Sequence, residues 1–310
     1  MGCRPRRRRQ RPWHDAWVTD QEARYDRLAE GYAEWWSPVH RPGTLALLDE
    51  VAADVADGAR RMVDVGCGTG ALAVEAVTRW PDVEVDGIDA SAGMLEVAMR
   101  EASSLPPILG DRVRLRQATA DRLPFADATF DVALSAFVLQ LVPSRPGALR
   151  EMRRVLRPRG RLAYVTWLRG GEPFPGDAVY DEARREVGLE PRWSDDDAEA
   201  DGDEGDGTDD DFDADPGDNH VPSPEVAVAQ LRRAGFSDVR ARGSVLEHGF
   251  TPWSYVGFIS RFDDEDEFAT MEPRQREALE HRLLERLARL SADRLVMRMP
   301  VVYVTGIRTR

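Results

Sequence analysis

Short apolar runs alternate with amphipathic stretches through the first half of the chain. In the amphipathic stretches apolar residues recur at the spacing of one face of an α-helix. This pattern predicts helices at residues 71–79, 91–102 and 146–156. The apolar runs end at glycine, proline or charged residues and predict buried strands at residues 62–65, 83–88, 113–117, 130–135 and 161–167. Strands that alternate with helices form right-handed βαβ units, so the pattern predicts a parallel sheet.

Further elements are predicted on both sides of this region. Upstream, apolar spacing predicts helices at residues 20–37 and 42–56, with His40 in the loop that follows the first helix. Downstream, a helix at 224–234 and a strand at 239–247 precede a long, mostly helical stretch at 251–294. That stretch breaks near Pro273, and a last strand is predicted at residues 299–308.

Charge is distributed unevenly along the 310 residues. The formal net charge is −14, and residues 195–218 contain fourteen Asp and Glu and no Arg. The first eleven residues contain six arginines, and all 42 basic residues of the chain are Arg. Both segments are too polar to bury a core, so a basic disordered tail at 1–12 and an acidic disordered insertion at 194–220 are predicted.

These segments divide the chain into parts of one predicted fold. The parts are N-terminal helices at 13–59, a core at 60–167, a cap segment at 168–193, and a C-terminal part at 221–310 that carries the helical insertion 251–294.

Composition excludes several classes of protein. No apolar run approaches the roughly 20 residues of a membrane span, and no apolar stretch follows the basic N-terminus, so a cytoplasmic protein is expected. The two cysteines, Cys3 and Cys67, cannot supply a disulfide framework or a cysteine-rich zinc site. Residues 209–213 have the opening spacing of a calcium loop, but Ala214 and His220 occupy the places of its glycine and its last glutamate. No metal site is therefore expected.

A glycine-rich turn follows the first predicted strand. The strand ends in Asp64, and Gly66, Gly68 and Gly70 then form a G-x-G-x-G pattern that lets a ligand approach the backbone closely. Alone, the turn is compatible with NAD, FAD or S-adenosylmethionine (SAM). The dinucleotide fingerprint is G-x-G-x-x-G, so the early third glycine disfavours a nicotinamide enzyme. The next strand ends in Asp89, which is placed to accept hydrogen bonds from ribose hydroxyls, while Ser91 can cap the following helix.

Four motifs in the predicted core resemble those of one enzyme family. They are the turn at 63–70, Gly-Ile-Asp-Ala-Ser at 87–91, Ala-Asp-Arg-Leu-Pro-Phe at 120–125 with Phe130 and Asp131, and Val-Leu-Arg-Pro-Arg-Gly at 155–160. Together they are similar to class I SAM-dependent methyltransferases, in the type 11 group that includes ubiquinone and menaquinone C-methyltransferases. The resemblance implies an α/β, Rossmann-like fold: a seven-stranded, mostly parallel sheet with helices on both faces and an antiparallel last strand.

The resemblance also implies SAM as the cofactor and assigns residues to its parts. Asp64 would hold the amino group, and the turn with Cys67 would surround the methionine portion. Asp89 would bind the ribose. The remaining contacts implied for the adenine or the sulfonium are Ala90, Met94, Thr119, Ala120, Asp121, Ser135 and Phe137. Thr119 stands where many relatives have Asp. Tyr25 and Tyr32 would close over the cofactor, although core aromatics would look the same.

Methyl transfer from SAM is an in-line displacement, so the protein mainly positions the acceptor and excludes water. A base is needed only if the acceptor loses a proton. His40 and Gln140 are the weak catalytic candidates. The expected partner is an unidentified small-molecule acceptor. Nucleic acid is not expected, because an acidic segment near the entrance would repel phosphates. A SAM-binding regulatory or scaffold protein without turnover is the main alternative, and a nicotinamide-dependent oxidoreductase is the weaker one.

Overall fold

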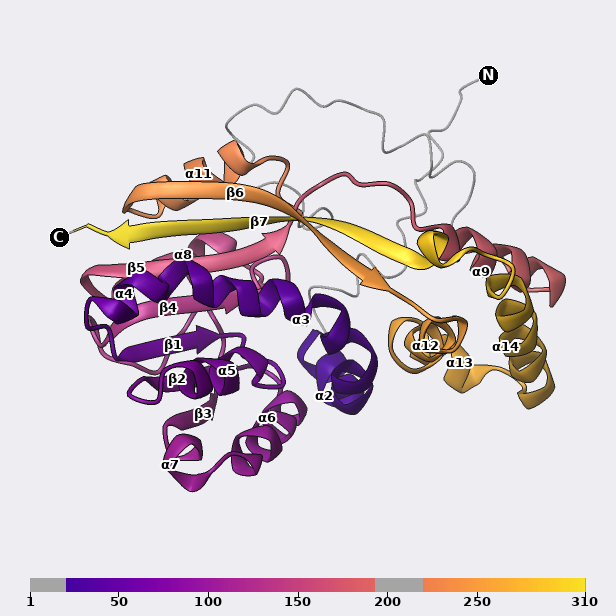
Figure 1. Ribbon diagram of the computed structural model, residues 1–310, viewed down its shortest axis with the longest axis horizontal. Helices are drawn as coiled ribbons and strands as arrows, with labels where there is room; N and C mark the ends of the chain where they lie inside the picture. Colours follow the sequence, from indigo (N-terminus) through magenta and orange to yellow (C-terminus); the bar gives the residue numbers. More distant parts are fainter. Residues whose placement is uncertain (1–20, 193–219, 310) are drawn as a thin grey trace, which may run out of the picture.

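The structure, a computed structural model, describes residues 21–192 and 220–309 of the chain (Figure 1). The predicted basic tail, and the predicted acidic insertion apart from His220, lie outside these residues. Within the described ranges, none of the helices combines the length and the apolar character that a bilayer crossing requires.

A seven-stranded sheet in the order β3-β2-β1-β4-β5-β7-β6 forms the centre of the fold (Figure 1). Strands β1 to β5 are mutually parallel where they pair, and β7 runs antiparallel to both β5 and β6. The predicted mostly parallel sheet with an antiparallel last strand is therefore confirmed. The strands are β1 (Arg61–Val65), β2 (Glu84–Asp89), β3 (Val113–Gln117), β4 (Phe130–Ala136), β5 (Leu156–Trp167), β6 (Phe236–Gly249) and β7 (Val296–Arg308).

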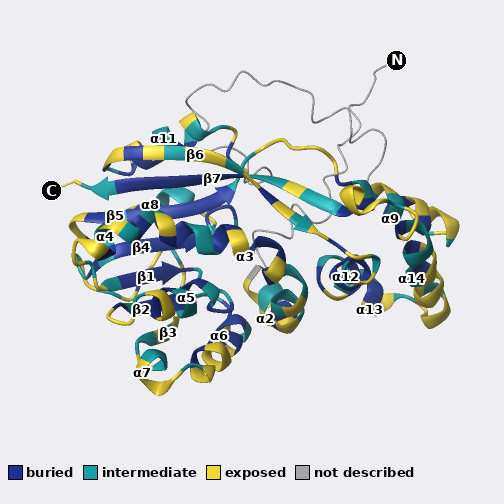
Figure 2. Cartoon of the chain, in the orientation of Figure 1, coloured by how far each residue is buried: buried dark blue, intermediate teal, exposed yellow. Residues whose placement is uncertain are grey.

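Both faces of the sheet are covered, and its central strands are buried (Figure 2). Successive side chains of a strand point to opposite faces, so Met62 and Val63 belong to two different cores. On the side of Val63 lie α8 (Arg145–Val155) and α11 (Pro224–Arg233). On the side of Met62 lie η2 (Leu47–Val51), α4 (Ala52–Ala56) and α5 (Ala71–Arg79). The helices α6 (Ala92–Ser104) and α7 (Pro107–Gly110) continue the chain between β2 and β3.

The N-terminal helices form one continuous helical run, and the predicted loop at His40 is wrong. The run passes from α2 (Gln21–Gly31) through a π-helical turn, η1 (Tyr32–Trp36), into α3 (Ser37–Ala46) and on to η2. Pro38 lies in the first turn of α3, where its fixed φ is compatible with the helix. Pro42 lies inside α3, where the packed face of the helix keeps the turn formed although one backbone hydrogen bond is lost.

A lobe of helices lies beside the sheet, between β6 and β7 in the sequence (Figure 1). Its elements are α12 (Pro252–Phe258), η5 (Ile259–Asp263), α13 (Glu265–Thr270), α14 (Pro273–Leu287) and η6 (Ala292–Leu295). The 168–193 segment contains an unpredicted helix, α9 (Pro175–Glu186), which packs on α14. Arg184 of α9 donates two hydrogen bonds, of 2.6 and 2.8 Å, to the Glu267 carboxylate. The role of this segment as a cap over the active site stays a prediction.

Candidate functional site

The glycine turn connects β1 to α5 in a conformation that depends on glycine. Gly66 and Gly68 have φ angles of +74° and +51°. A Cβ atom on Gly66 would lie 2.2 Å from Cγ2 of Val138, so this glycine is required by packing inside the protein. A Cβ atom on Gly68 would meet nothing within 4 Å. The turn is therefore fixed on its inner side and leaves open space in front of Gly68, where a ligand can approach the backbone.

Asp89 ends β2 and ties the glycine turn to the start of α6. Its Oδ2 accepts a hydrogen bond of 2.8 Å from the Gly68 N–H, and its Oδ1 accepts one of 2.9 Å from the Ser91 N–H. Ser91 caps α6, because its hydroxyl oxygen accepts a bond of 3.0 Å from the Met94 N–H. Each oxygen of the Asp89 carboxylate can accept a further bond. Burial raises the pKa of Asp89, and the backbone N–H groups around it oppose that rise.

Asp64 is a buried carboxyl group beside the turn, and only 1% of its surface is exposed. Its Oδ2 has no hydrogen-bond partner among the described residues. Burial, and secondarily the charge of Asp89, raises the pKa of Asp64 to about 7. A buried acceptor without a partner is costly, and a cationic donor next to it would remove that cost. The residue therefore fits the ammonium group of an amino-acid ligand such as SAM.

Helix α3 lies over the turn and encloses a narrow cavity of about 30 Å³. The lining residues are Tyr32, Ser37, His40, Arg41, Thr44, Asp64, Gly66, Cys67, Gly68, Thr69, Ala71, Leu72 and Ala136. The predicted residues Asp64, Gly66, Cys67, Gly68 and His40 are thus brought together in one cavity. Sequence reasoning missed Ser37, Arg41 and Thr44, since their places beside the turn depend on the helix passing through two prolines.

His40 is buried in this cavity and hydrogen-bonded through both ring nitrogens. Its Nε2 lies 2.7 Å from the Tyr32 hydroxyl oxygen in a hydrogen bond, and its Nδ1 lies 3.4 Å from Oγ1 of Thr44. Burial lowers the pKa of His40 to about 4, so the imidazole is neutral at pH 7. The neutral imidazole is therefore one of the groups in the cavity lining that could accept a proton, and the Asp64 carboxylate is another.

The loop after β4 is held by side chains that were predicted to face the ligand. Ser135 donates a hydrogen bond of 2.9 Å to the Val65 carbonyl. The Gln140 amide donates a hydrogen bond of 2.7 Å to the Phe137 carbonyl and accepts one of 2.8 Å from the Thr166 hydroxyl. Both hydrogen bonds are buried. Gln140 therefore braces the loop, which leaves His40 as the catalytic candidate. Phe137 has a positive φ of 57° and places its ring 5.2 Å from that of His40.

The residues predicted for the adenine end lie at the same edge of the sheet but outside the cavity. Thr119 and Asp121 are exposed after β3, and the neighbouring Ala118 N–H donates 3.0 Å to the Asp89 carbonyl. Met94 is buried against α2, with Tyr25 and Tyr32 packed around it. The contacts of Ala90, Met94, Thr119, Ala120 and Asp121 with adenine stay predictions.

Asp26 of α2 joins the N-terminal helix to this edge and was missed from the sequence. Its Oδ1 accepts hydrogen bonds of 2.6 Å from the Ser91 hydroxyl and 2.9 Å from the Gly93 N–H. A carboxylate at the N-terminus of α6 also meets the positive end of the helix dipole. The signal lay in the Tyr-Asp-x-x-Ala-x-x-Tyr pattern at 25–32, from which only the tyrosines had been assigned a role.

Replacing Asp26 by alanine is expected to release α2 from α6 and to speed amide hydrogen exchange in residues 21–31. The hydrogen bonds from Ser91 and Gly93 lower the pKa of Asp26, so its contribution is present above the unfolded pKa and is lost as the pH falls through the lower, folded value. Exchange measured by mass spectrometry at pH 7 tests this. Asp82→Ala, at an exposed loop position, is the control, and equal exchange in both variants would contradict the role of Asp26.

A model of the methyltransferase domain matches residues 63–164. The chain is 38% identical over 117 residues to the ubiquinone/menaquinone biosynthesis C-methyltransferase of Syntrophotalea carbinolica, covering 38% of this chain and 48% of that protein. It is 36% identical over 165 residues to the 27-O-demethylrifamycin SV methyltransferase of Amycolatopsis mediterranei, covering 53% and 59%. The chain therefore spans about half the length of the curated relatives that it matches.

Two solved structures share the fold at low sequence identity. The YcgJ protein from Bacillus subtilis aligns with a TM-score of 0.51 and 20% identity, over 86% of this chain and 99% of that one. Phosphoethanolamine N-methyltransferase 2 of Haemonchus contortus aligns with a TM-score of 0.53 and 16% identity, over 94% and 59%. The matched domain, the strand order and the glycine turn agree with one another: residues 63–164 match a methyltransferase domain, and the chain is similar to SAM-dependent methyltransferases.

Proposed function

We propose that this protein transfers a methyl group from SAM to a small-molecule acceptor. The observation that carries the proposal is the joint geometry of the glycine turn, with open space at Gly68, the unpartnered Oδ2 of Asp64 and the Asp89 carboxylate. Asp64 would hold the amino group of SAM and Asp89 its ribose hydroxyls. The bound cofactor supplies an activated methyl group on a positively charged sulfur. The glycine spacing and the matched domain both disfavour the nicotinamide alternative.

The chain's own residues would then position the acceptor and exclude water. Helix α3 and the η1 turn cover the glycine turn so closely that the enclosed cavity has a volume of only about 30 Å³. Because this volume is smaller than SAM, binding of SAM would require these helices to move away from the turn, as lids do in many enzymes. His40, neutral at pH 7, would accept the proton of an acceptor that loses one. A cytoplasmic location stays a prediction.

Transfer of labelled methyl groups from SAM tests the proposal. The full chain is incubated with methyl-labelled SAM and a metabolite extract, and labelled products are separated and identified by mass spectrometry. Asp89→Asn, which loses one of the two oxygens that would accept from the ribose hydroxyls, serves as the background. A labelled product formed by the wild type alone supports a methyltransferase and identifies the acceptor. Tight SAM binding without transfer to any fraction would instead favour the non-catalytic SAM-binding alternative.

SAM affinity is expected to rise about tenfold between pH 5.5 and pH 7. The pKa of Asp64 is raised to about 7, so its carboxyl group is mostly protonated at the lower pH and gains its charge as the pH rises. Only the charged form attracts the ammonium group of SAM. Calorimetric titrations at a series of pH values measure the effect, and Asp64→Asn should bind more weakly with a flatter profile. An equally steep profile in that variant would assign the pH dependence to another group.

A further inference from the structure

A second pocket lies at the edge of the sheet opposite the glycine turn. Its volume is about 470 Å³. It is formed where α8 ends, where α11 runs into β6, and where β7 finishes beside the start of β5. The lining residues are Asp127, Arg150, Arg153, Arg154, Arg233, Ala234, Gly235 and Arg308. Five guanidinium groups thus surround one pocket with a single lining carboxylate, and none of these residues lines the cavity at the glycine turn.

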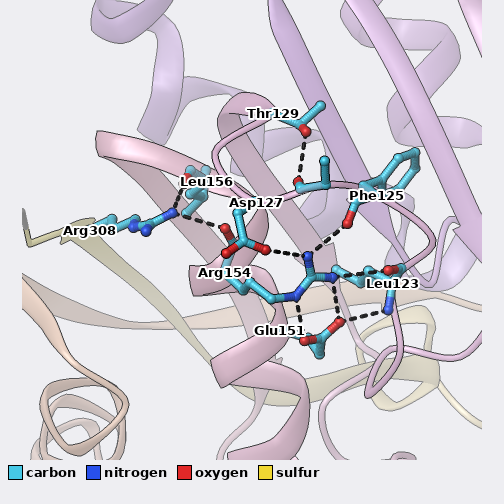
Figure 3. A network of polar contacts seen from close by, with 9 residues as sticks. Leu123, Phe125, Asp127, Thr129, Glu151, Arg154, Leu156 and Arg308 are labelled. Carbon is cyan, nitrogen blue, oxygen red and sulfur yellow. Dashed lines mark hydrogen bonds and ion pairs between the residues drawn. The ribbon is translucent and has the colours of Figure 1, made fainter.

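Every N–H group of the Arg154 guanidinium donates a hydrogen bond to a residue beside the pocket (Figure 3). Its Nε and Nη2 donate hydrogen bonds of 2.7 and 2.8 Å to the Glu151 carboxylate, and its Nη1 donates 2.9 Å to Oδ1 of Asp127. The backbone carbonyls of Leu123 and Phe125 accept its other two N–H groups. All five N–H donors of Arg154 are therefore satisfied, and the carboxylates of Glu151 and Asp127 both pair with this one guanidinium group.

The positive charges of Arg150, Arg153 and Arg308 have no such compensation. Arg153 donates to the Gly235 carbonyl and the Thr309 hydroxyl. Arg308 donates to the carbonyls of Arg154 and Leu156 (Figure 3). Arg308 Nε is buried without a hydrogen-bond partner, and Arg150 is exposed. Among the described residues, none of these three forms an ion pair with a carboxylate. Guanidinium groups keep their charge at any physiological pH, so their mutual repulsion persists until an anion enters.

We propose that this pocket binds a phosphate group, either free or at the end of a small ester. Several planar guanidinium groups around one opening match the charge and the tetrahedral oxygens of phosphate, which arginine binds with paired N–H donors. The donors come from α8 and β7: the Arg154 side chain ties α8 to the loop after β3, and Arg308 of β7 bonds to the carbonyls of Arg154 and Leu156. The site therefore exists before the ligand arrives. It lies at the opposite edge of the sheet from the methyl-transfer site and would serve for docking or regulation rather than for chemistry.

Calorimetric titration of the full chain at low ionic strength tests the proposal, with inorganic phosphate and phenyl phosphate as probes and sodium chloride as the blank. Arg150→Gln is expected to weaken phosphate binding about tenfold, the loss of one charge-assisted contact, without changing the fold because its side chain is exposed. Asp127→Asn removes the lining carboxylate and should tighten binding about threefold. Tighter binding of phenyl phosphate than of inorganic phosphate would assign an ester, and equal affinity would assign free phosphate.

The matched control is Arg274→Gln, at an exposed arginine on α14 in the helical lobe. It removes the same charge from the same chain but leaves the pocket intact, so phosphate affinity should stay at the wild-type value. Equal weakening in Arg150→Gln and Arg274→Gln would mean that net charge alone attracts phosphate, and would overturn the proposal. Phosphate heats no larger than those of chloride would overturn it as well.

Discussion

Replacing Asp89 by asparagine is expected to weaken SAM binding about a hundredfold. In the proposed complex the carboxylate accepts hydrogen bonds from both ribose hydroxyls, and bonds to a charged acceptor contribute roughly 1.5–3 kcal/mol each. Loss of about 2.7 kcal/mol corresponds to that factor. Asparagine keeps one carbonyl oxygen but loses the second acceptor, and with it either a ribose contact or the bond to the Gly68 N–H. Isothermal titration calorimetry measures the affinity.

The control for this variant is Glu96→Gln, which removes an acidic charge from an exposed position on α6. It should bind SAM like the wild type. Thermal denaturation of both variants separates a local effect at the ribose from a general loosening of the turn. Wild-type affinity in Asp89→Asn, with the fold intact, would remove the ribose assignment and leave the glycine turn without its proposed partner.

The strands and the core helices could be predicted from the sequence because their signals are local. Helix α5 begins after Gly70 and ends before Trp80, as its apolar spacing and the following Pro81 indicate. Asp89 was found because an acid ends the strand that follows the glycine turn, and the role of Asp64 followed from the family resemblance of that turn. The parallel pairing of β1 and β2 brings both residues to one edge of the sheet. The predicted fold class therefore rested on short-range patterns that tertiary contacts reinforce.

The N-terminal helices show where local signals fail. The sequence predicted a loop at His40 between two helices, yet α3 continues through Pro38 and Pro42 because its buried face packs on the β6 strand, with Gly43 against Leu246. Tertiary packing overrides propensity here. The contact of Asp26 with Ser91 joins residues 65 positions apart, so it is not visible in any local window. The position of α3 over the glycine turn depends on the uninterrupted helix and on the Asp26 contact, so it could not be predicted from local sequence patterns.

Gly66 and Gly68 of the turn are expected to respond differently to the addition of one methyl group. In Gly66→Ala the new Cβ would lie 2.2 Å from Cγ2 of Val138, on a backbone with φ of +74°, so the Val138 side chain or the turn must shift. Overpacking and left-handed strain together cost about 2–4 kcal/mol, which lowers the melting temperature by roughly 5–10 °C. In Gly68→Ala the Cβ meets no protein atom within 4 Å, and the strain alone costs about 1 kcal/mol.

Gly68→Ala is therefore expected to fold but to lose at least about tenfold in SAM affinity, because its methyl group fills the space that the ligand would occupy. Gly58→Ala is the matched control: its φ of +108° imposes backbone strain, its Cβ also meets nothing, and it lies in the loop before β1, outside the cavity. Thermal denaturation and calorimetry on the three variants separate packing, strain and ligand contact. If Gly68→Ala binds SAM as tightly as Gly58→Ala does, the open side of the turn does not face the cofactor, and the methionine end of SAM must lie elsewhere.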